Sequence, residues 1–424
     1  MSVNLTPISE GVEGLFIKND RFNTSLISFN FYLPLNGDTV ADNGLLPFIL
    51  TTCSDKYQDF SKLNYKLSKL YGAHLEASTE KTADFQLLKI AISVINDRFA
   101  IDGEQLTAEA CELLLSLIFE PKVADGAFCS EDVEREKRKA IEHIRSEISE
   151  KRIYAKNRLI EEMYKGKPYG TPKCGSEEQV NACTGESLYS AWKNLLSSAF
   201  VRVHVVSSAI PAGLFDTIGE KFSSIVRDNI TDCTSVTSTE PAERVNTITE
   251  KMSVAQGKLV MGFSSEIYGN NAVSLMVATD VFGGGPYSRL FSNVREKMSL
   301  CYYCSATAVR IKGLVTVDSG VEAQNFEKAQ SEILNQLEIV KKGEFSDFEF
   351  ESSIRSLRDS LKTYNDSQSS TDLWYALRIS DEKLISPEEF ALLLDNVKKD
   401  AVIEAAKGIK LHTVYRLMPD SAEV

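Results

Sequence analysis

The sequence predicts an α+β protein built from two similar halves of roughly 200 residues each. Three observations lead to this prediction: strand-like and helix-like periodicities alternate along the chain, one polar linker lies near its middle, and the same order of elements begins again after that linker. The chain has 424 residues, 43% hydrophobic and 25% charged, which is ordinary globular usage. This composition excludes a disordered chain, a collagen and a disulfide-rich miniprotein.

The elements of the first half follow from hydrophobic periodicity. Apolar side chains at every second position from Ile27 to Leu33 predict a half-buried strand, and leucines spaced by three and four residues predict a helix that ends at Gly72. The other expected elements are a strand at 85–94, a helix at 106–119, a long charged helix at 131–158, a strand at 201–206 and a short helix at 212–226.

Residues 231–244 are rich in serine and threonine and read as a linker. Beyond it we expect a strand at 258–263, a helix at 272–281 that stops at a run of three glycines, a helix at 290–298, a strand at 300–309, a charged helix from about 345, a capping box at Ser386, and a closing strand at 409–418. Residues 1–235 and 240–424 are therefore predicted to be two duplicated domains. A chance match of element order is the alternative.

Charge and hydropathy limit the expected partners. The net charge of −13 argues against binding to phosphate backbones or anionic lipid surfaces, so neither nucleic acid nor membrane is an expected partner. The longest apolar stretches, 45–50 and 273–281, are far shorter than the ~18–20 residues that span a bilayer. The first residues lack an export signal, and the eight cysteines follow no regular spacing, so we expect reduced thiols and a cytoplasmic protein.

Residue types and their spacing alone reveal no catalytic, metal-binding or phosphate-binding motif. A zinc site usually takes two ligands close together in sequence, but the four histidines are widely scattered. Cys301 and Cys304 have ligand-like spacing, yet positions i and i+3 of a strand face opposite sides, so buried thiols are expected unless a bulge intervenes. The glycines at 283–285 follow a helix rather than a strand, which favours a helix break over a phosphate cradle.

Longer stretches of the sequence are more informative, because they resemble the signature of a known family. The stretch from Gly283 to Tyr302, Gly-Gly-Gly-Pro-Tyr-Ser-Arg-Leu-Phe followed by Arg-Glu-Lys and Leu-Cys-Tyr, resembles the second-domain signature of the pitrilysin/insulinase-type metallopeptidases, which include the mitochondrial processing peptidases. Gly44-Leu-Leu, Leu70-Tyr-Gly-Ala and Glu134-Arg-Glu-Lys resemble that family's first domain. The resemblance implies two homologous domains, each a mostly antiparallel sheet with helices packed on one side, which together form half of a clam-shell.

The departures from this family pattern concern its zinc site. The family's His-x-x-Glu-His aligns with Pro47, Leu50 and Thr51, and its downstream glutamate ligand falls at His143. Proline and leucine cannot bind zinc, and none of the three residues can act as general base for the water. The resemblance therefore implies a chain with neither metal nor other cofactor, inactive on its own.

The family's Arg/Tyr pair is retained, as Arg295 and Tyr302. In active relatives these residues reach the substrate near the scissile carbonyl, where a cation and a phenol donor stabilise an oxyanion. A purely structural role, as an exposed helix residue and a strand core residue, is the alternative. Within the family, the chain resembles the zinc-less elongation factor P aminopentanol-modification-associated proteins, through strings such as Asn43-Gly-Leu-Leu-Pro-Phe and Leu300-Cys-Tyr-Tyr.

Three functions are consistent with this resemblance. The first is a non-catalytic, substrate-contacting subunit of a two-chain zinc metallopeptidase, paired with a homologous zinc-bearing chain or, without one, with itself. The second is an inert peptide-binding or scaffold protein that holds an extended peptide at a sheet edge. The third is an autonomous metallopeptidase with unconventional ligands.

Overall fold

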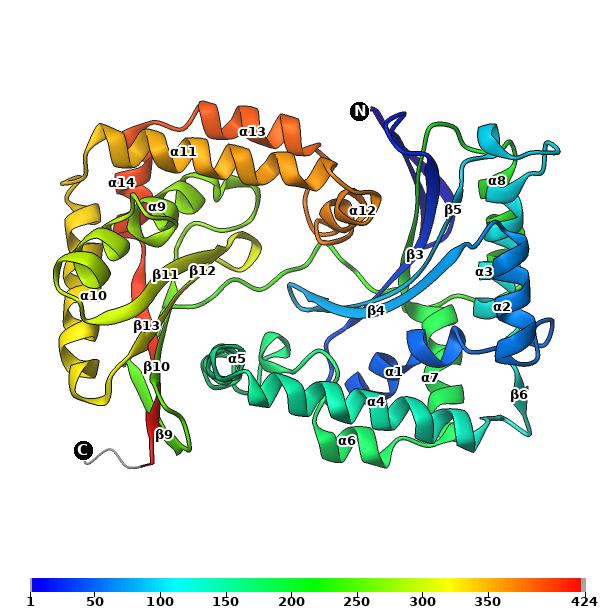
Figure 1. Ribbon diagram of the computed structural model, residues 1–424, viewed down its shortest axis with the longest axis horizontal. Coiled ribbons are helices and arrows are strands. Elements are labelled where there is room, and N and C mark those ends of the chain that lie inside the picture. The colour runs from blue at the N-terminus through cyan, green and yellow to red at the C-terminus, as the bar shows by residue number, and fades with distance from the viewer. Residues whose placement is uncertain (1, 421–424) are drawn as a thin grey trace. The chain divides into compact units, whose positions relative to one another are not determined.

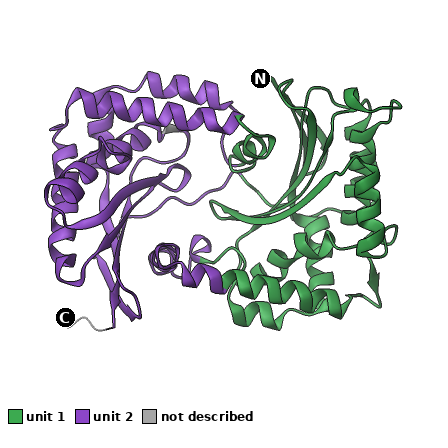
Figure 2. Cartoon of the chain, in the orientation of Figure 1, with its two compact units in different colours: residues 1–144, 171–233, 366–379 green, residues 145–170, 234–365, 380–424 purple. Residues whose placement is uncertain are grey.

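The computed structural model describes residues 2–420 and divides into two compact units. The first comprises residues up to 144 together with 171–233 and 366–379, and the second comprises 145–170, 234–365 and 380 onward (Figure 2). The chain therefore passes between the units more than once, and each unit contains a segment from the other half of the sequence.

The first unit is built on a six-stranded sheet of order β1-β2-β8-β3-β5-β4. Its strands β3, β4 and β5 are labelled in Figure 1. All neighbouring strands are antiparallel except β2 and β8. One face carries the apolar side chains that alternate along β3, and it packs against α1 (Val40–Leu50), α3 (Leu106–Phe119) and α7 (Gly185–Ser198). The strands are β1 (Ser2–Ser9), β2 (Val12–Lys18), β3 (Thr24–Pro34), β4 (His74–Thr82), β5 (Phe85–Ile95) and β8 (Phe200–Ser207).

The second unit repeats this topology. Its five-stranded sheet has the order β11-β12-β10-β13-β9, with β9 parallel to β13 and the other pairs antiparallel. This order corresponds to β4-β5-β3-β8-β2 of the first unit, including the position of the parallel pair. The α+β fold and the repeated element order are thus confirmed. The strands are β9 (Asn246–Met252), β10 (Gly257–Ser264), β11 (Cys301–Val309), β12 (Leu314–Val321) and β13 (Lys410–Pro419).

Most expected helices lie close to their predicted positions, and the capping box at Ser386 is present. The predicted helix at 131–158 is instead two helices, because the Glu150 side chain accepts a hydrogen bond from the Arg152 backbone N–H and starts a new one. The helices are α1 (Val40–Leu50), α2 (Phe60–Lys69), α3 (Leu106–Phe119), α4 (Ser130–Ser149), α5 (Lys151–Met163), α6 (Glu177–Ala182), α7 (Gly185–Ser198), α8 (Leu214–Ser223), α9 (Val273–Gly283), a π-helix (Leu290–Lys297), α10 (Phe326–Lys341), α11 (Asp347–Lys362), α12 (Gln368–Ala376), α13 (Pro387–Asp395) and α14 (Lys399–Lys407).

Two helices are exchanged between the halves of the sequence. Helix α5, which follows the charged helix α4, packs on β10 and β13 of the second unit, where Leu159 meets Val260 and Leu417. Helix α12, which follows α11, packs on β3 and β8 of the first unit. Each sheet therefore has helices mainly on one face, as expected, and one exchanged helix on the opposite face.

The polar side chains of the first sheet lie under α12. Ser28 and Tyr32, which alternate with the apolar residues of β3, bond to the Asp372 carboxylate and the Ala376 carbonyl oxygen. Lys89 and His204 from the neighbouring strands also bond to Asp372. Within residues 2–420, no helix is both long and apolar enough to cross a membrane.

Candidate functional site

The C-terminal turn of α1 holds the three positions that align with a zinc motif. Pro47 lies inside the helix, and its backbone nitrogen has no hydrogen to donate to the helix. Pro47 is buried, and Leu50, fully buried, belongs to the apolar core of the first unit. Neither side chain has an atom that could coordinate a metal.

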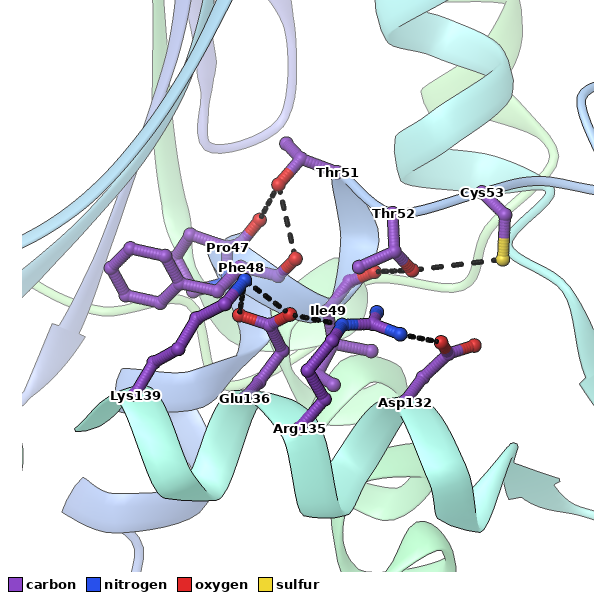
Figure 3. Close-up of polar contacts among 10 residues, drawn as sticks. All are labelled: Pro47, Phe48, Ile49, Thr51, Thr52, Cys53, Asp132, Arg135, Glu136 and Lys139. Atoms are coloured by element: carbon purple, nitrogen blue, oxygen red, sulfur yellow. Dashed lines mark hydrogen bonds and ion pairs between the residues drawn. The ribbon is translucent and has the colours of Figure 1, made fainter. Parts of the chain in front are cut away.

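Thr51, the last of the three positions, uses its hydroxyl to close the helix. The hydroxyl lies 2.9 Å from the Pro47 carbonyl oxygen and 3.0 Å from that of Phe48 (Figure 3). Zinc sites in proteins are built from imidazole, thiolate and carboxylate groups. A single neutral hydroxyl, already donating to its own helix, is therefore a poor substitute.

His143, the fourth position, lies on α4 and does not meet Thr51 at one site. It lines a cavity of about 400 Å³ that is bordered by α1 and β4. Thr51 lines a different cavity of about 770 Å³. Phe48, Glu136 and Lys139 border both cavities and so lie between them.

A row of charged side chains on α4 faces the end of α1. Asp132 pairs with Arg135 at 2.6 Å, Arg135 with Glu136 at 3.0 Å, and Glu136 with Lys139 at 2.9 Å (Figure 3). The Glu136 side chain is only 5% exposed, and its carboxylate pairs with two cations that are themselves partly exposed, Arg135 and Lys139. The sequence alone indicates a solvated helix face here. The three-residue spacing of opposite charges was the available signal for the ion pairs, but not for the burial of Glu136.

These residues do not fit a zinc ion. Two of the four aligned positions have no donor atom, and the remaining two border separate cavities. Across the part of the chain that the structure describes, no three histidine, cysteine, aspartate or glutamate side chains are grouped so that they could hold a metal ion. We therefore derive no chemistry that passes through a metal on this chain.

Arg295 of the second unit lies on the π-helix that precedes β11. Its side chain is 41% exposed, its guanidinium stacks 4.6 Å from the Phe291 ring, and its Nε lies 3.4 Å from Glu296. Exposed ion pairs of this kind hold a side chain only weakly. Helices of the π type are rare and often mark functional positions.

Tyr302 lies at the start of β11 and is 61% exposed. Its hydroxyl donates to the Glu322 carboxylate at 2.9 Å, and this hydrogen bond raises the pKa of Tyr302. The alternative expectation of a strand core residue is therefore wrong for Tyr302. The reason is local: β11 has an irregularity between Cys301 and Tyr303, so Tyr302 lies outside the regular pairing with β12.

Comparisons with known proteins extend over the whole chain. The family described as "Peptidase M16 inactive domain" matches residues 182–357. The "Probable inactive metalloprotease YmfF" of Bacillus subtilis strain 168 is 29% identical over 416 residues, which cover 96% of each chain.

Two solved structures show the same fold. A conserved protein from Enterococcus faecalis V583 has a TM-score of 0.91 at 24% identity and covers 100% of both chains. The peptidase M16 inactive domain from Pseudomonas fluorescens has a TM-score of 0.79 at 14% identity and covers 100% of this chain and 99% of that one. The two-unit α+β architecture is thus shared with these structures over its full length.

Proposed function

Because the chain is a homologue of the M16, or pitrilysin-like, peptidases, we propose that it is a proteolytically inactive subunit that contacts substrate. In this role it would work with a separate M16 chain whose zinc motif is intact. The supporting observation is the contrast between its two functional regions. Helix α1 has no group suited to zinc, whereas Arg295 and Tyr302 are exposed on the second unit.

The proposed substrate is a peptide in an extended conformation. A cation at Arg295 and a phenol donor at Tyr302 are suited to a carbonyl oxygen on which negative charge develops. Arg295 is held by the exposed Glu296 carboxylate and by stacking on Phe291, and Tyr302 is held by the exposed Glu322 carboxylate. A substrate can displace such exposed ion pairs and hydrogen bonds. The partner chain would supply the metal and the general base.

Co-expression with a zinc-bearing homologue tests this proposal directly. Cleavage of a fluorogenic peptide by the pair should fall by about 100-fold when Arg295→Ala or Tyr302→Phe is introduced here, the size of effect seen when one oxyanion donor is removed. Arg355→Ala, an exposed arginine on α11, is the matched control and should leave cleavage unchanged. Equal activity of the Arg295→Ala pair and the wild-type pair would contradict the proposal.

A second candidate function is peptide binding without hydrolysis. Strand β4 is an edge strand, paired with β5 alone among the described strands, and residues 77–80 of β4 border the cavity next to α1. An unpaired strand edge is a template for an added peptide strand. Ser78→Pro should then abolish peptide binding by the chain alone, whereas Arg295→Ala should not affect it.

The identity of the partner is part of the same proposal. Native mass spectrometry of the chain alone and of the co-expressed pair distinguishes a heterodimer from a homodimer. Zinc analysis of the purified chain tests the autonomous peptidase, since stoichiometric zinc held through dialysis would support that reading. The cytoplasmic location and the narrower resemblance to the elongation factor P modification-associated group remain predictions.

A further inference from the structure

The irregularity in β11 places two cysteines on one face of the strand. Cys301 is paired opposite Val321 of β12, and Cys304 is paired opposite Ser319. Val321 and Ser319 are two residues apart on a regular strand, so they face the same side of the sheet. Cys301 and Cys304 therefore share a face, and Tyr302 is the extra residue between them.

This arrangement also shortens the distance between the two cysteines. Their pairing partners are two residues apart on an extended strand, which puts the Cα atoms of the cysteines about 7 Å apart along the strand, rather than the roughly 10 Å of a regular i, i+3 pair. Disulfides span Cα distances of about 4.4–6.8 Å. A small tightening of the bulge is therefore sufficient to join the two sulfurs.

The two thiols are chemically unequal. Both residues are buried, Cys301 with 8% and Cys304 with 5% of its surface exposed. A hydrogen bond from Cys304, together with the positive charge of Arg295, lowers the pKa of Cys301 despite its burial. The same hydrogen bond and burial raise the pKa of Cys304. Cys301 is thus the better nucleophile and Cys304 the resolving thiol.

We propose that Cys301 and Cys304 form a redox pair that closes to a disulfide across the bulge and moves Tyr302. With hydrogen peroxide as oxidant, Cys301 loses its proton, and its thiolate attacks one peroxide oxygen and becomes a sulfenic acid. The other peroxide oxygen leaves as hydroxide, which takes up the proton that Cys301 released and becomes water. The Cys304 thiol attacks the sulfenic sulfur, and its proton leaves with the hydroxyl group as water. Two thiols lose two electrons, and one peroxide yields two waters.

The disulfide has a structural consequence for the residue that it encloses. Tyr302 lies between the two cysteines, and its hydroxyl is held by Glu322 at 2.9 Å. Tightening the backbone at 301–304 changes the direction of the Tyr302 side chain and breaks this hydrogen bond. This redox change takes place within one chain and requires no peptidase partner.

Peptide mass spectrometry of the oxidised full chain tests the pair. Cleavage after Lys297 and Arg310 releases residues 298–310, which contain Cys301 and Cys304 and no other cysteine. After treatment with hydrogen peroxide, this peptide should be lighter by two hydrogens and resist alkylation, and dithiothreitol should reverse both changes. Two alkylatable thiols in this peptide, or sulfinic acid in place of the disulfide, would overturn the proposal.

A rate comparison and a hydrogen-exchange measurement complete the test. The pair should be oxidised about tenfold faster than Cys111, a buried cysteine on α3 whose pKa burial raises to about 12. Cys304→Ser should abolish the disulfide, while Cys233→Ser should leave it intact. Amide exchange in residues 298–310 should change on oxidation of the wild type, and unchanged exchange would refute the movement of Tyr302.

Discussion

Replacing Asp372 with alanine tests how α12 is held on the first unit. The Asp372 side chain is fully buried, and its carboxylate binds three groups from three strands: the Lys89 ammonium at 2.6 Å, the His204 Nδ1 at 2.7 Å and the Ser28 hydroxyl at 2.5 Å. Burial raises the pKa of Asp372, but the charge of Lys89 and the hydrogen bond with His204 outweigh it and hold the pKa well below the usual range. Asp372 is therefore ionised in the folded chain.

The expected loss of stability comes mainly from Lys89, whose buried ammonium loses its carboxylate partner in the variant. The Lys89 side chain is 6% exposed, and its pKa is raised because the attraction of Asp372 exceeds the cost of burial. Removing one member of a buried ion pair typically costs about 3–5 kcal/mol, since the remaining charge is uncompensated. We therefore expect Asp372→Ala to lower the free energy of unfolding of the first unit by about 3–5 kcal/mol at pH 7.

Tryptophan fluorescence during urea unfolding measures this loss selectively. The chain has two tryptophans, Trp192 and Trp374, and both belong to the first unit. Asp366→Ala, an exposed position on the same exchanged segment, is the matched control and should change stability by no more than about 0.5 kcal/mol.

A double substitution separates the buried charge from the packing of α12. Lys89→Met combined with Asp372→Leu removes both charges and should recover the part of the loss that the uncompensated Lys89 charge causes. The hydrogen bonds of His204 and Ser28 to Asp372 stay lost in both variants. A loss below about 1 kcal/mol for Asp372→Ala, or no recovery in the double variant, would refute the reasoning.

The remaining predictions concern pH, the degenerate helix and the glycine run. Burial lowers the pKa of His204, so below about pH 6.5 the unfolded chain binds a proton that the folded chain excludes. The free energy of unfolding should therefore fall by up to about 1.4 kcal/mol for each pH unit below that value. In urea titrations, His204→Gln should reduce this slope, whereas substitution of an exposed histidine, His74→Gln, should not. Leu50→Glu places a carboxylate in the apolar core and should destabilise the first unit by about 3 kcal/mol or more, so unchanged tryptophan unfolding would contradict its burial. Gly284→Ala puts a Cβ at 2.1 Å from the buried Asp280 carboxylate and should cost about 1–3 kcal/mol, measured by circular dichroism.

Local features of the fold were predictable from sequence because their causes are local. The alternation along β3, the apolar stripe of α3 and the capping box at Ser386 each depend on residues within one element. The positions of α5 and α12 depend instead on which sheet each helix finally covers. Hydrophobic periodicity contains no information about that choice.

The candidate site likewise has some features that residue identity predicts and others that depend on packing. The loss of ligand atoms at Pro47 and Leu50 is evident from residue identity alone. The burial of Glu136 and the irregular pairing around Tyr302 are consequences of packing and strand register, which one sequence does not specify. Cys301 and Cys304 can converge only if a bulge interrupts the strand, and only the pairing of β11 with β12 reveals that bulge.

The exchange of α5 and α12 affects how this chain can be divided. A cut in the linker at 234–238 would yield one piece that retains α5 but lacks α12, and another that retains α12 but lacks α5. In the first piece, Lys89 and His204 would lose their carboxylate and face water; in the second, the apolar surface around Val260 and Leu417 would be uncovered. The two pieces are therefore suited to fragment complementation, in which neither is complete until each has donated its helix to the other.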